Sequence, residues 1–187
     1  MIDLPKKISA TGNDCLVASV LMVCMYWRKS RQSPRWNIAD NLDDQEWDKV
    51  YQKGLGYVKM SGMPTNNIKW FLNTLNFPLD SRLELVEDTR QLTNLLSLNI
   101  PPIVIYDRDY LIRSVHGIGH AVVLVDKTEE MLVSIDPSLH PKYVYKLPKT
   151  DFEEAWKFKQ NATVIIYPKS YKIRHREIPS TTLQKWM

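Results

Sequence analysis

Residues 13–29, NDCLVASVLMVCMYWRK, decide how the rest of the sequence is interpreted. Asn13 and Asp14 are residue types that cap the start of a helix, and a nearly continuous apolar run from Leu16 to Trp27 follows them. The run is shorter than the ~20 apolar residues that span a membrane, and it lacks the small-residue cleavage site of a secretory signal. Its apolar residues lie all round a helical wheel, so we expect a helix from about Cys15 to Lys29 that is buried on most sides.

The composition is typical of one globular domain. Of the 187 residues, 44% are hydrophobic and 25% are charged, which excludes a disordered or collagen-like chain. Cys15 and Cys24 are the two cysteines of the sequence and cannot form a disulfide framework. Together with the lack of a signal or membrane span, they predict a cytoplasmic protein that does not bind a membrane.

The net charge of +4 is concentrated near the C-terminus. Residues 169–187 hold five basic residues and one acidic residue, which leaves 20 basic and 20 acidic residues in positions 1–168. We therefore predict a neutral domain over 1–168 and a basic C-terminal extension over 169–187. The extension is a candidate contact for a protein partner, and its alternation of large side chains and cations over 171–176 favours an edge strand over a nucleic-acid-binding arm.

Hydrophobic periodicity predicts helices first and strands second. The helices are expected at 15–29, at about 43–52, after Pro64, around Leu92–Leu96 and around Phe152–Trp156. The strands are expected at 82–86, 103–106, 120–126, 131–136, 143–145 and 162–167. This order predicts an α+β domain in which N-terminal helices pack on a C-terminal antiparallel sheet.

Cys15 is the first candidate for chemistry. A thiol attacks a carbonyl as the thiolate, and the positive end of a helix stabilises that charge. The alternative is that Cys15 is a small buried core residue, the usual fate of a free cysteine. Cys24 lies about 13 Å further along the same helix, where the dipole gives no such advantage, so we interpret it as a core residue.

His120 is the candidate proton carrier for a thiol nucleophile. It shares the segment His116-Gly117-Ile118-Gly119-His120 with a second histidine, a spacing that on a helix would suggest zinc. The two glycines argue against a helix there, and no acidic residue accompanies the pair. We therefore expect no metal and no other cofactor, and we place His120 at the start of a strand, where its side chain can face a cleft.

The two strands that follow His120 predict its partner. If Ala121, Val123 and Val125 share a core face with the alternate residues of 131–135, a three-residue turn at 127–129 places Asp136 opposite His120. Opposed residues have Cβ atoms roughly 5 Å apart, within reach of a carboxylate that orients an imidazole. Asp126 is the second candidate for that carboxylate, although it lies at the wrong end of its strand.

These motifs together resemble those of papain-like cysteine peptidases, and most closely the double-glycine-leader peptidases that process bacteriocins, cysteine peptidase family thirty-nine. The matching segments are Asp14-Cys15 with Ala18 and Met22 in the apolar helix, Gly119-His120 before a valine-rich strand, and Asp136-Pro137. The resemblance covers about 9–168. It implies a papain-like fold with the nucleophile on the first helix and the catalytic residues Cys15, His120 and Asp136.

Two departures from the family pattern concern the oxyanion hole. Leu16 stands where the family usually has glycine, and no glutamine precedes Cys15, although that side chain usually helps bind the oxyanion. Ser9, Thr11 or Asn13 could donate instead, beside the backbone N–H of Cys15. Losing one oxyanion donor costs ~2.7–4 kcal/mol of transition-state stabilisation, so a slow or inactive enzyme stays an alternative.

The resemblance implies hydrolysis of a peptide, amide or thioester bond in a peptide or protein substrate, with a small residue such as glycine at the cleavage site. The alternative function is a peptidase-like module that binds a peptide without cleaving it. The retained Cys15, His120 and Asp136 favour the enzyme, and the missing glutamine favours the module. A cysteine-reactive probe discriminates between the two.

Overall fold

The computed structural model describes residues 1–4, 13–30, 43–60, 62–113, 115–117, 119–139 and 144–171. The helices in these ranges are α1 (Cys15–Lys29), α2 (Asp44–Leu55), α3 (Asn67–Thr74), α4 (Thr89–Ser97), α5 (Arg108–Arg113) and α6 (Lys149–Lys157). The strands are β1 (Leu79–Leu85), β2 (Ile103–Asp107), β3 (Gly119–Lys127), β4 (Met131–Ile135), β5 (Tyr145–Pro148) and β6 (Ala162–Pro168). The predicted α+β class is confirmed.

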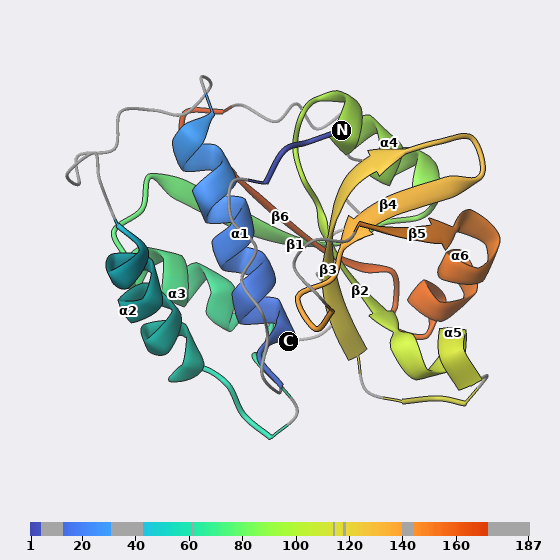
Figure 1. Ribbon diagram of the computed structural model, residues 1–187, viewed down its shortest axis with the longest axis horizontal. Coiled ribbons are helices and arrows are strands. Elements are labelled where there is room, and N and C mark those ends of the chain that lie inside the picture. The colour runs from blue at the N-terminus through green and yellow to red at the C-terminus, as the bar shows by residue number, and fades with distance from the viewer. Residues whose placement is uncertain are drawn as a thin grey trace.

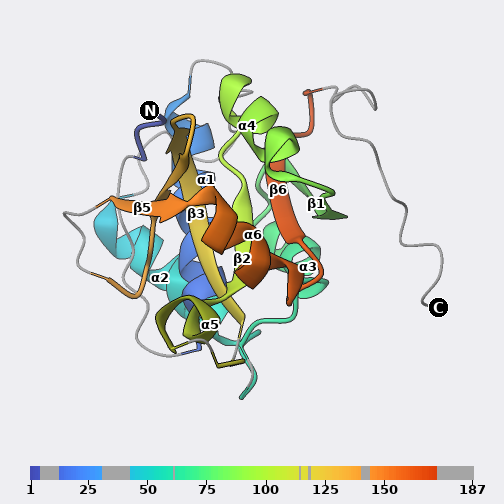
Figure 2. The ribbon, with the colours of Figure 1, turned by 90° about the vertical axis from the view of Figure 1, so that its right-hand side faces the viewer.

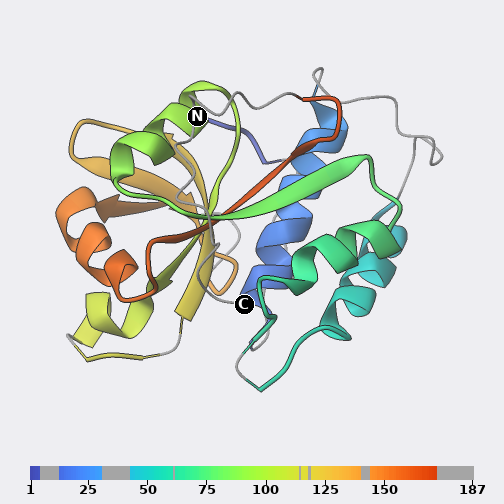
Figure 3. The same ribbon diagram turned by 180° about the vertical axis from the view of Figure 1, so that it is seen from behind.

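The strands form one antiparallel sheet in the order β1-β6-β2-β3-β4-β5. Helix α1 packs against β3 and β6 with α2 beside it, while α4 and α6 pack against β3 and β2 from the other side (Figure 1). The view from behind shows α3 alongside β1 (Figure 3). Because helices cover both faces of β3, all residues from His120 to Val125 are buried.

Helix α1 is the centre of the hydrophobic core, as its apolar sequence predicts. Leu16 to Met25 and Trp27 are all buried. Full burial of one large apolar side chain contributes about 1.5–3 kcal/mol, so this helix is fixed firmly against the sheet. The indole N–H of Trp27 donates to the Ile166 carbonyl of β6 at 2.7 Å, which satisfies the polar atom of a fully buried ring.

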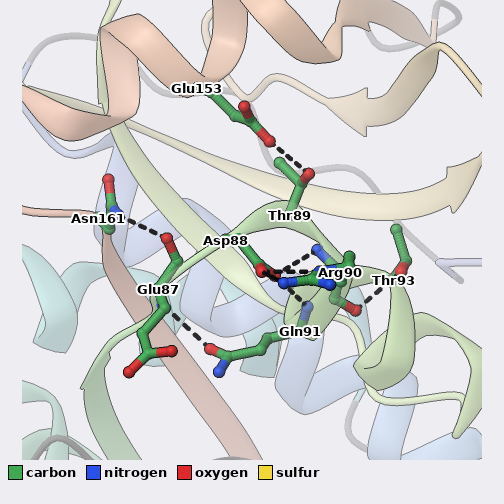
Figure 4. Close-up of polar contacts among 8 residues, drawn as sticks. All are labelled: Glu87, Asp88, Thr89, Arg90, Gln91, Thr93, Glu153 and Asn161. Carbon is green, nitrogen blue, oxygen red and sulfur yellow. Dashed lines mark hydrogen bonds and ion pairs between the residues drawn. The ribbon is translucent and has the colours of Figure 1, made fainter.

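A polar cluster on the side away from α1 fixes α4 and α6 to each other (Figure 4). The Asp88 carboxylate caps α4 by accepting the N–H groups of Arg90 at 2.9 Å and Gln91 at 3.3 Å. The Thr89 hydroxyl donates to Glu153 of α6 at 2.6 Å. These bonds anchor the turn between β1 and α4, and they keep α6 against the sheet.

The β3–β4 hairpin differs from its prediction. The observed pairs are Val123 with Ile135 and Leu124 with Ser134, two positions away from the predicted register. A β-bulge between Leu124 and Asp126 shifts the ladder, and the turn is closed by Thr128, which bonds Met131 through its backbone and its hydroxyl. The prediction that alternate residues of β4 face the core is also wrong.

Burial shows why that alternation fails. Leu132 and Ser134 are buried, whereas Met131 and Ile135, expected in the core, are only half-buried. Leu132, Val133 and Ser134 are consecutive and all buried, so both faces of β4 are buried over these positions and no polar side is left to alternate with.

Other predictions differ at element ends. Helix α5 was not expected, and the strand predicted at 143–145 begins instead at Tyr145, with residue 143 outside the described ranges. Asn13 and Asp14 do not cap α1 as expected, because Asp14 occupies the N-cap position without a side-chain cap bond. Among the described residues, no helix has the length and apolarity needed to cross a membrane.

The domain boundary at residue 168 stays a prediction. The Lys169 N–H donates to the Pro78 carbonyl at 2.9 Å, and the Tyr171 ring lies 6.5 Å from that of Trp27. The first residues of the predicted extension therefore contact the domain. Residues 172–187, which include most of the predicted edge strand, lie outside the described ranges.

Candidate active site

Cys15 is the first residue of α1 and is half-buried, so its thiol lies at the positive end of the helix dipole. Asp14, the residue before it, is buried and accepts a hydrogen bond from the Tyr51 hydroxyl of α2. This contact ties the first turn of α1 to its neighbouring helix. Figure 1 and the side view in Figure 2 place α5 at the same end of the molecule as the first turn of α1.

His120 of β3 and Asp136 are brought into direct contact. The distance between His120 Nε2 and Asp136 Oδ1 is 2.8 Å, and both side chains are almost fully buried. With Nε2 bonded to the carboxylate, Nδ1 is the imidazole nitrogen left for the Cys15 thiol, the other hydrogen-bond partner of the ring. Tyr106 packs edge-on against the imidazole at 5.9 Å between ring centroids.

The Asp136 carboxylate reaches His120 by a different route from the predicted one. Asp136 lies just beyond the end of β4, so it is not part of the strand ladder. It opens a turn in which its own Oδ1 accepts the Ser138 N–H at 2.8 Å. The turn aims the carboxylate back at the imidazole, which compensates for the register difference of two residues.

The electrostatics of the three groups favour an ion pair between Cys15 and His120. Burial alone would raise the pKa of the Cys15 thiol. The hydrogen bond and charge of His120, with the backbone N–H groups of Ala121 and Leu16, outweigh burial and lower the pKa below its usual 9.0. The site therefore stabilises a thiolate.

The imidazole is shifted in the complementary direction. Burial alone would lower the pKa of His120, but its bonds to Asp136 and Cys15 outweigh burial and raise the pKa to about 9. Burial likewise opposes ionisation of Asp136, yet His120, the Ser138 N–H and the charge of Arg108 hold its pKa below the ordinary value. The arrangement holds a proton on the imidazole at neutral pH.

Cys24 lies in the same helix and has the opposite environment. It is fully buried, and burial raises the pKa of its thiol far above the ordinary value. The structure therefore agrees with the interpretation of Cys24 as an inert core residue.

The candidate oxyanion donors are only partly described. Asn13 is exposed beside Cys15 and donates one Nδ2 hydrogen to the Met60 carbonyl at 2.6 Å. An amide nitrogen has two hydrogens, so a second donor remains on this side chain. Ser9 and Thr11, the other candidates, lie outside the described residues.

Cavities lined by described residues adjoin the thiol, and two of them bear on the site. One has a volume of about 170 Å³ and is lined by residues that include Cys15, Gly62 and Gly119. Gly62 has a φ of +96°, and an added Cβ would come within 3.2 Å of the Asn13 carbonyl, so glycine suits this wall. The second cavity has a volume of about 390 Å³ and lies between Cys15, His120 and α5.

The sequence analysis did not identify a set of contacts around Asp107 that fixes the backbone before His120, which we call the support beneath His120. Asp107 at the end of β2 is fully buried and accepts the Gly117 N–H at 3.0 Å and the Tyr110 N–H at 3.2 Å. The Lys159 ammonium lies 3.6 Å from that carboxylate and donates to the Gly117 carbonyl at 2.8 Å. These contacts fix the segment that leads into His120. A polar residue directly after a buried strand was the signal that could have revealed it.

The other candidates do not join the site. Asp126 pairs with the N-terminal amine at 3.5 Å, at the far end of β3 from His120. No group of three or more His, Cys, Asp or Glu side chains in the described ranges is arranged to hold a metal ion. His116 and His120, considered for zinc, face different carboxylates.

The fold is shared with known peptidases, although the sequence alone matches none. No family model matches the chain, and no curated protein is significantly similar to it in sequence. The structure resembles a C39-like peptidase from Bacillus anthracis with a TM-score of 0.64 and 13% identity, covering 91% of this chain and 98% of that one.

Two further structures give the same result. One is a double glycine motif protease from an AMS/PCAT transporter, in complex with the leader peptide, with a TM-score of 0.57, 16% identity, and coverage of 89% and 93%. The other is the peptidase domain of Streptococcus ComA, a bifunctional transporter, with a TM-score of 0.57, 17% identity, and coverage of 87% and 98%. The chain therefore has the fold of these peptidases, as its motifs predicted.

Proposed function

We propose that the chain is a cysteine peptidase in which Cys15 is the nucleophile, His120 carries the proton and Asp136 orients His120. The observation that carries the proposal is the 2.8 Å contact between His120 Nε2 and Asp136 Oδ1, with a thiol of lowered pKa as the other partner of the ring. The shared peptidase fold supports it at the level of architecture.

The chemistry begins from the ion pair. The Cys15 thiolate attacks the carbonyl carbon of the scissile bond, and the developing oxyanion accepts hydrogen bonds from the Cys15 N–H and the second Asn13 amide hydrogen. The His120 imidazolium gives its proton to the departing amine, which leaves an acyl group on Cys15. Neutral His120 then takes a proton from water, and the hydroxide attacks the acyl carbon and expels the Cys15 thiolate, which restores the ion pair.

A peptide substrate is supported by the structure that resembles this chain and holds a leader peptide. The cavity of about 170 Å³ beside Cys15, walled by Gly62 and Gly119, has room for a small side chain. We therefore propose cleavage next to a small residue, of which glycine is one. The cytoplasmic location and a protein partner for residues 169–187 remain predictions.

A peptide-binding module without turnover is the alternative, and the missing glutamine before Cys15 is its only support. Binding a peptide does not require a thiol of lowered pKa, nor a buried carboxylate that keeps an imidazole protonated. Hydrolysis needs a nucleophilic thiolate and a proton donor, whereas peptide binding needs neither, so we favour the enzyme.

The test compares new protein N-termini in cells that express the native chain or its Cys15→Ala variant. We expect a set of N-termini that appears with the native chain and disappears with Cys15→Ala. Cys24→Ala is the matched control, because it removes the buried thiol by the same substitution, and it should keep the set. Identical N-termini with native and Cys15→Ala protein would contradict a peptidase.

A further inference from the structure

One face of α5 forms a wall of the larger cavity. Arg108, Asp109, Ile112 and Arg113 line it, together with Cys15 and His120. The spacing of these four residues, at i, i+1, i+4 and i+5, places them on one side of the helix. The helix therefore presents two guanidinium groups to the cavity that contains the thiol.

The two arginines are not neutralised by the part of the chain that the structure describes. None of its carboxylates lies within 4.0 Å of the Arg108 or Arg113 guanidinium. Arg108 acts on Asp136 only through its charge, which helps to lower the pKa of that carboxyl. Two cations beside a cavity without a bonded anion favour an anionic ligand.

Asp109 is the one carboxylate among the described residues that lines the same cavity, and it lies against Gly117. Its side chain touches Gly117, where an added Cβ would overlap the Asp109 carboxylate. Although Asp109 and Arg113 are four residues apart, no salt bridge joins them in the described structure. Asp109 thus contacts the backbone of residue 117 and leaves Arg113 available.

We propose that Arg113 and Arg108 bind a carboxylate of the substrate next to the scissile bond, so that this site prefers acidic peptides. This inference rests on the proposed function, because it assigns the specificity of the same site. A guanidinium binds a carboxylate through two parallel N–H bonds, which gives orientation as well as attraction. The carboxylate belongs either to an Asp or Glu side chain or to the C-terminus of a short peptide.

The first test needs no turnover. Iodoacetate and iodoacetamide both alkylate a thiolate, forming an S–C bond and releasing iodide, and they differ by one negative charge. We expect Arg113→Gln to lower the ratio of the iodoacetate rate to the iodoacetamide rate at Cys15 by about threefold at low ionic strength. Arg113→Glu should lower it by about tenfold, and 0.5 M salt should reduce both effects.

Arg90→Gln is the matched control, because it makes the same change of net charge on α4, where Arg90 pairs with Asp88. Its ratio should equal that of the native chain. An unchanged ratio in both Arg113 variants, or an equal fall in Arg90→Gln, would overturn the proposal. Failure of Cys15 to react with iodoacetamide below pH 8 would instead contradict the proposed nucleophile.

The second test separates the two sources of the carboxylate. Three peptide sets carry an acidic residue with an amidated C-terminus, a free C-terminus with neutral side chains, or neither charge. Faster cleavage of the first or second set identifies the source, and the preference should fall in Arg113→Gln. Equal cleavage of all three overturns the proposal. If no set is cleaved, the peptidase function fails and the alkylation ratio decides the carboxylate site by itself.

Discussion

His116 and His120 are four residues apart, and each lies beside a buried carboxylate, yet the two pairs differ in their geometry. His120 is 9% exposed and 2.8 Å from Asp136, whereas His116 is 63% exposed and 3.7 Å from Asp107. The first imidazole packs against Tyr106 in the interior, and the second stacks on Tyr110 at the surface.

The difference lies in what else each carboxylate binds. Asp107 already accepts two backbone N–H groups and faces the Lys159 ammonium, so its charge is satisfied without His116. Asp136 accepts one backbone N–H and directs the same oxygen at His120. A histidine next to an aspartate is therefore not enough for proton transfer. The carboxylate must lack other groups that satisfy its charge, so that the imidazole is its main partner, and both side chains must be shielded from water.

The largest expected difference is in turnover. His120→Ala removes the proposed proton carrier and should lower kcat/KM on a peptide found by the N-terminal comparison by about 10³-fold or more. His116→Ala removes an exposed ring and should change it by less than about threefold. Equal losses in the two variants, measured by peptide hydrolysis, would break the distinction between the pairs.

Substitution of Asp136 should lower activity, whereas substitution of Asp107 should lower stability. Asp136→Asn keeps the shape of the side chain but no longer holds His120 protonated, so kcat/KM should fall at least about a hundredfold. Asp107→Asn weakens the bonds to two N–H groups and leaves Lys159 without its carboxylate, which should cost about 2 kcal/mol of unfolding free energy. Urea unfolding and peptide hydrolysis of both variants test this. A reversed pattern would mean that Asp107 is the catalytic carboxylate.

The pH profile of kcat/KM should show that Asp136 acts on His120. The proposed mechanism requires Cys15 ionised and His120 protonated, so kcat/KM should rise as the lowered pKa of Cys15 is passed and fall above about pH 9, the pKa of His120. Asp136→Asn removes a group that raises the pKa of His120, so the alkaline limb should move to lower pH by about one unit. An alkaline limb that stays in place would show that Asp136 does not act on His120.

The smallest effect is expected for the stability of the exposed pair. His116→Ala removes a stacked ring on Tyr110 and a long, half-solvated contact to Asp107, so it should cost no more than about 1 kcal/mol of unfolding free energy. Thermal unfolding measures it. A loss as large as that of Asp107→Asn would mean that His116 is part of the support beneath His120.

The sequence predicted the parts of the molecule that depend on local pattern. The apolar run and the residues around it predicted the bounds of α1. Short motifs identified Cys15, His120 and Asp136 as candidate site residues. The hairpin register failed because the bulge near Val125 leaves no mark in an alternating apolar run. Helix α5 and its cavity were missed because six residues are too few to show a helical period, and their role depends on tertiary contact.

The proposed mechanism depends on His120 keeping Cys15 as a thiolate at neutral pH, and alkylation near pH 6 measures this ion pair. Iodoacetamide should label Cys15 and spare Cys24 in the native chain, as located by mass spectrometry of the peptides. In His120→Ala, labelling of Cys15 at pH 6 should be mostly lost, while the urea midpoint changes little. Labelling of Cys15 only above about pH 8, with or without His120, would contradict the ion pair and the peptidase mechanism built on it.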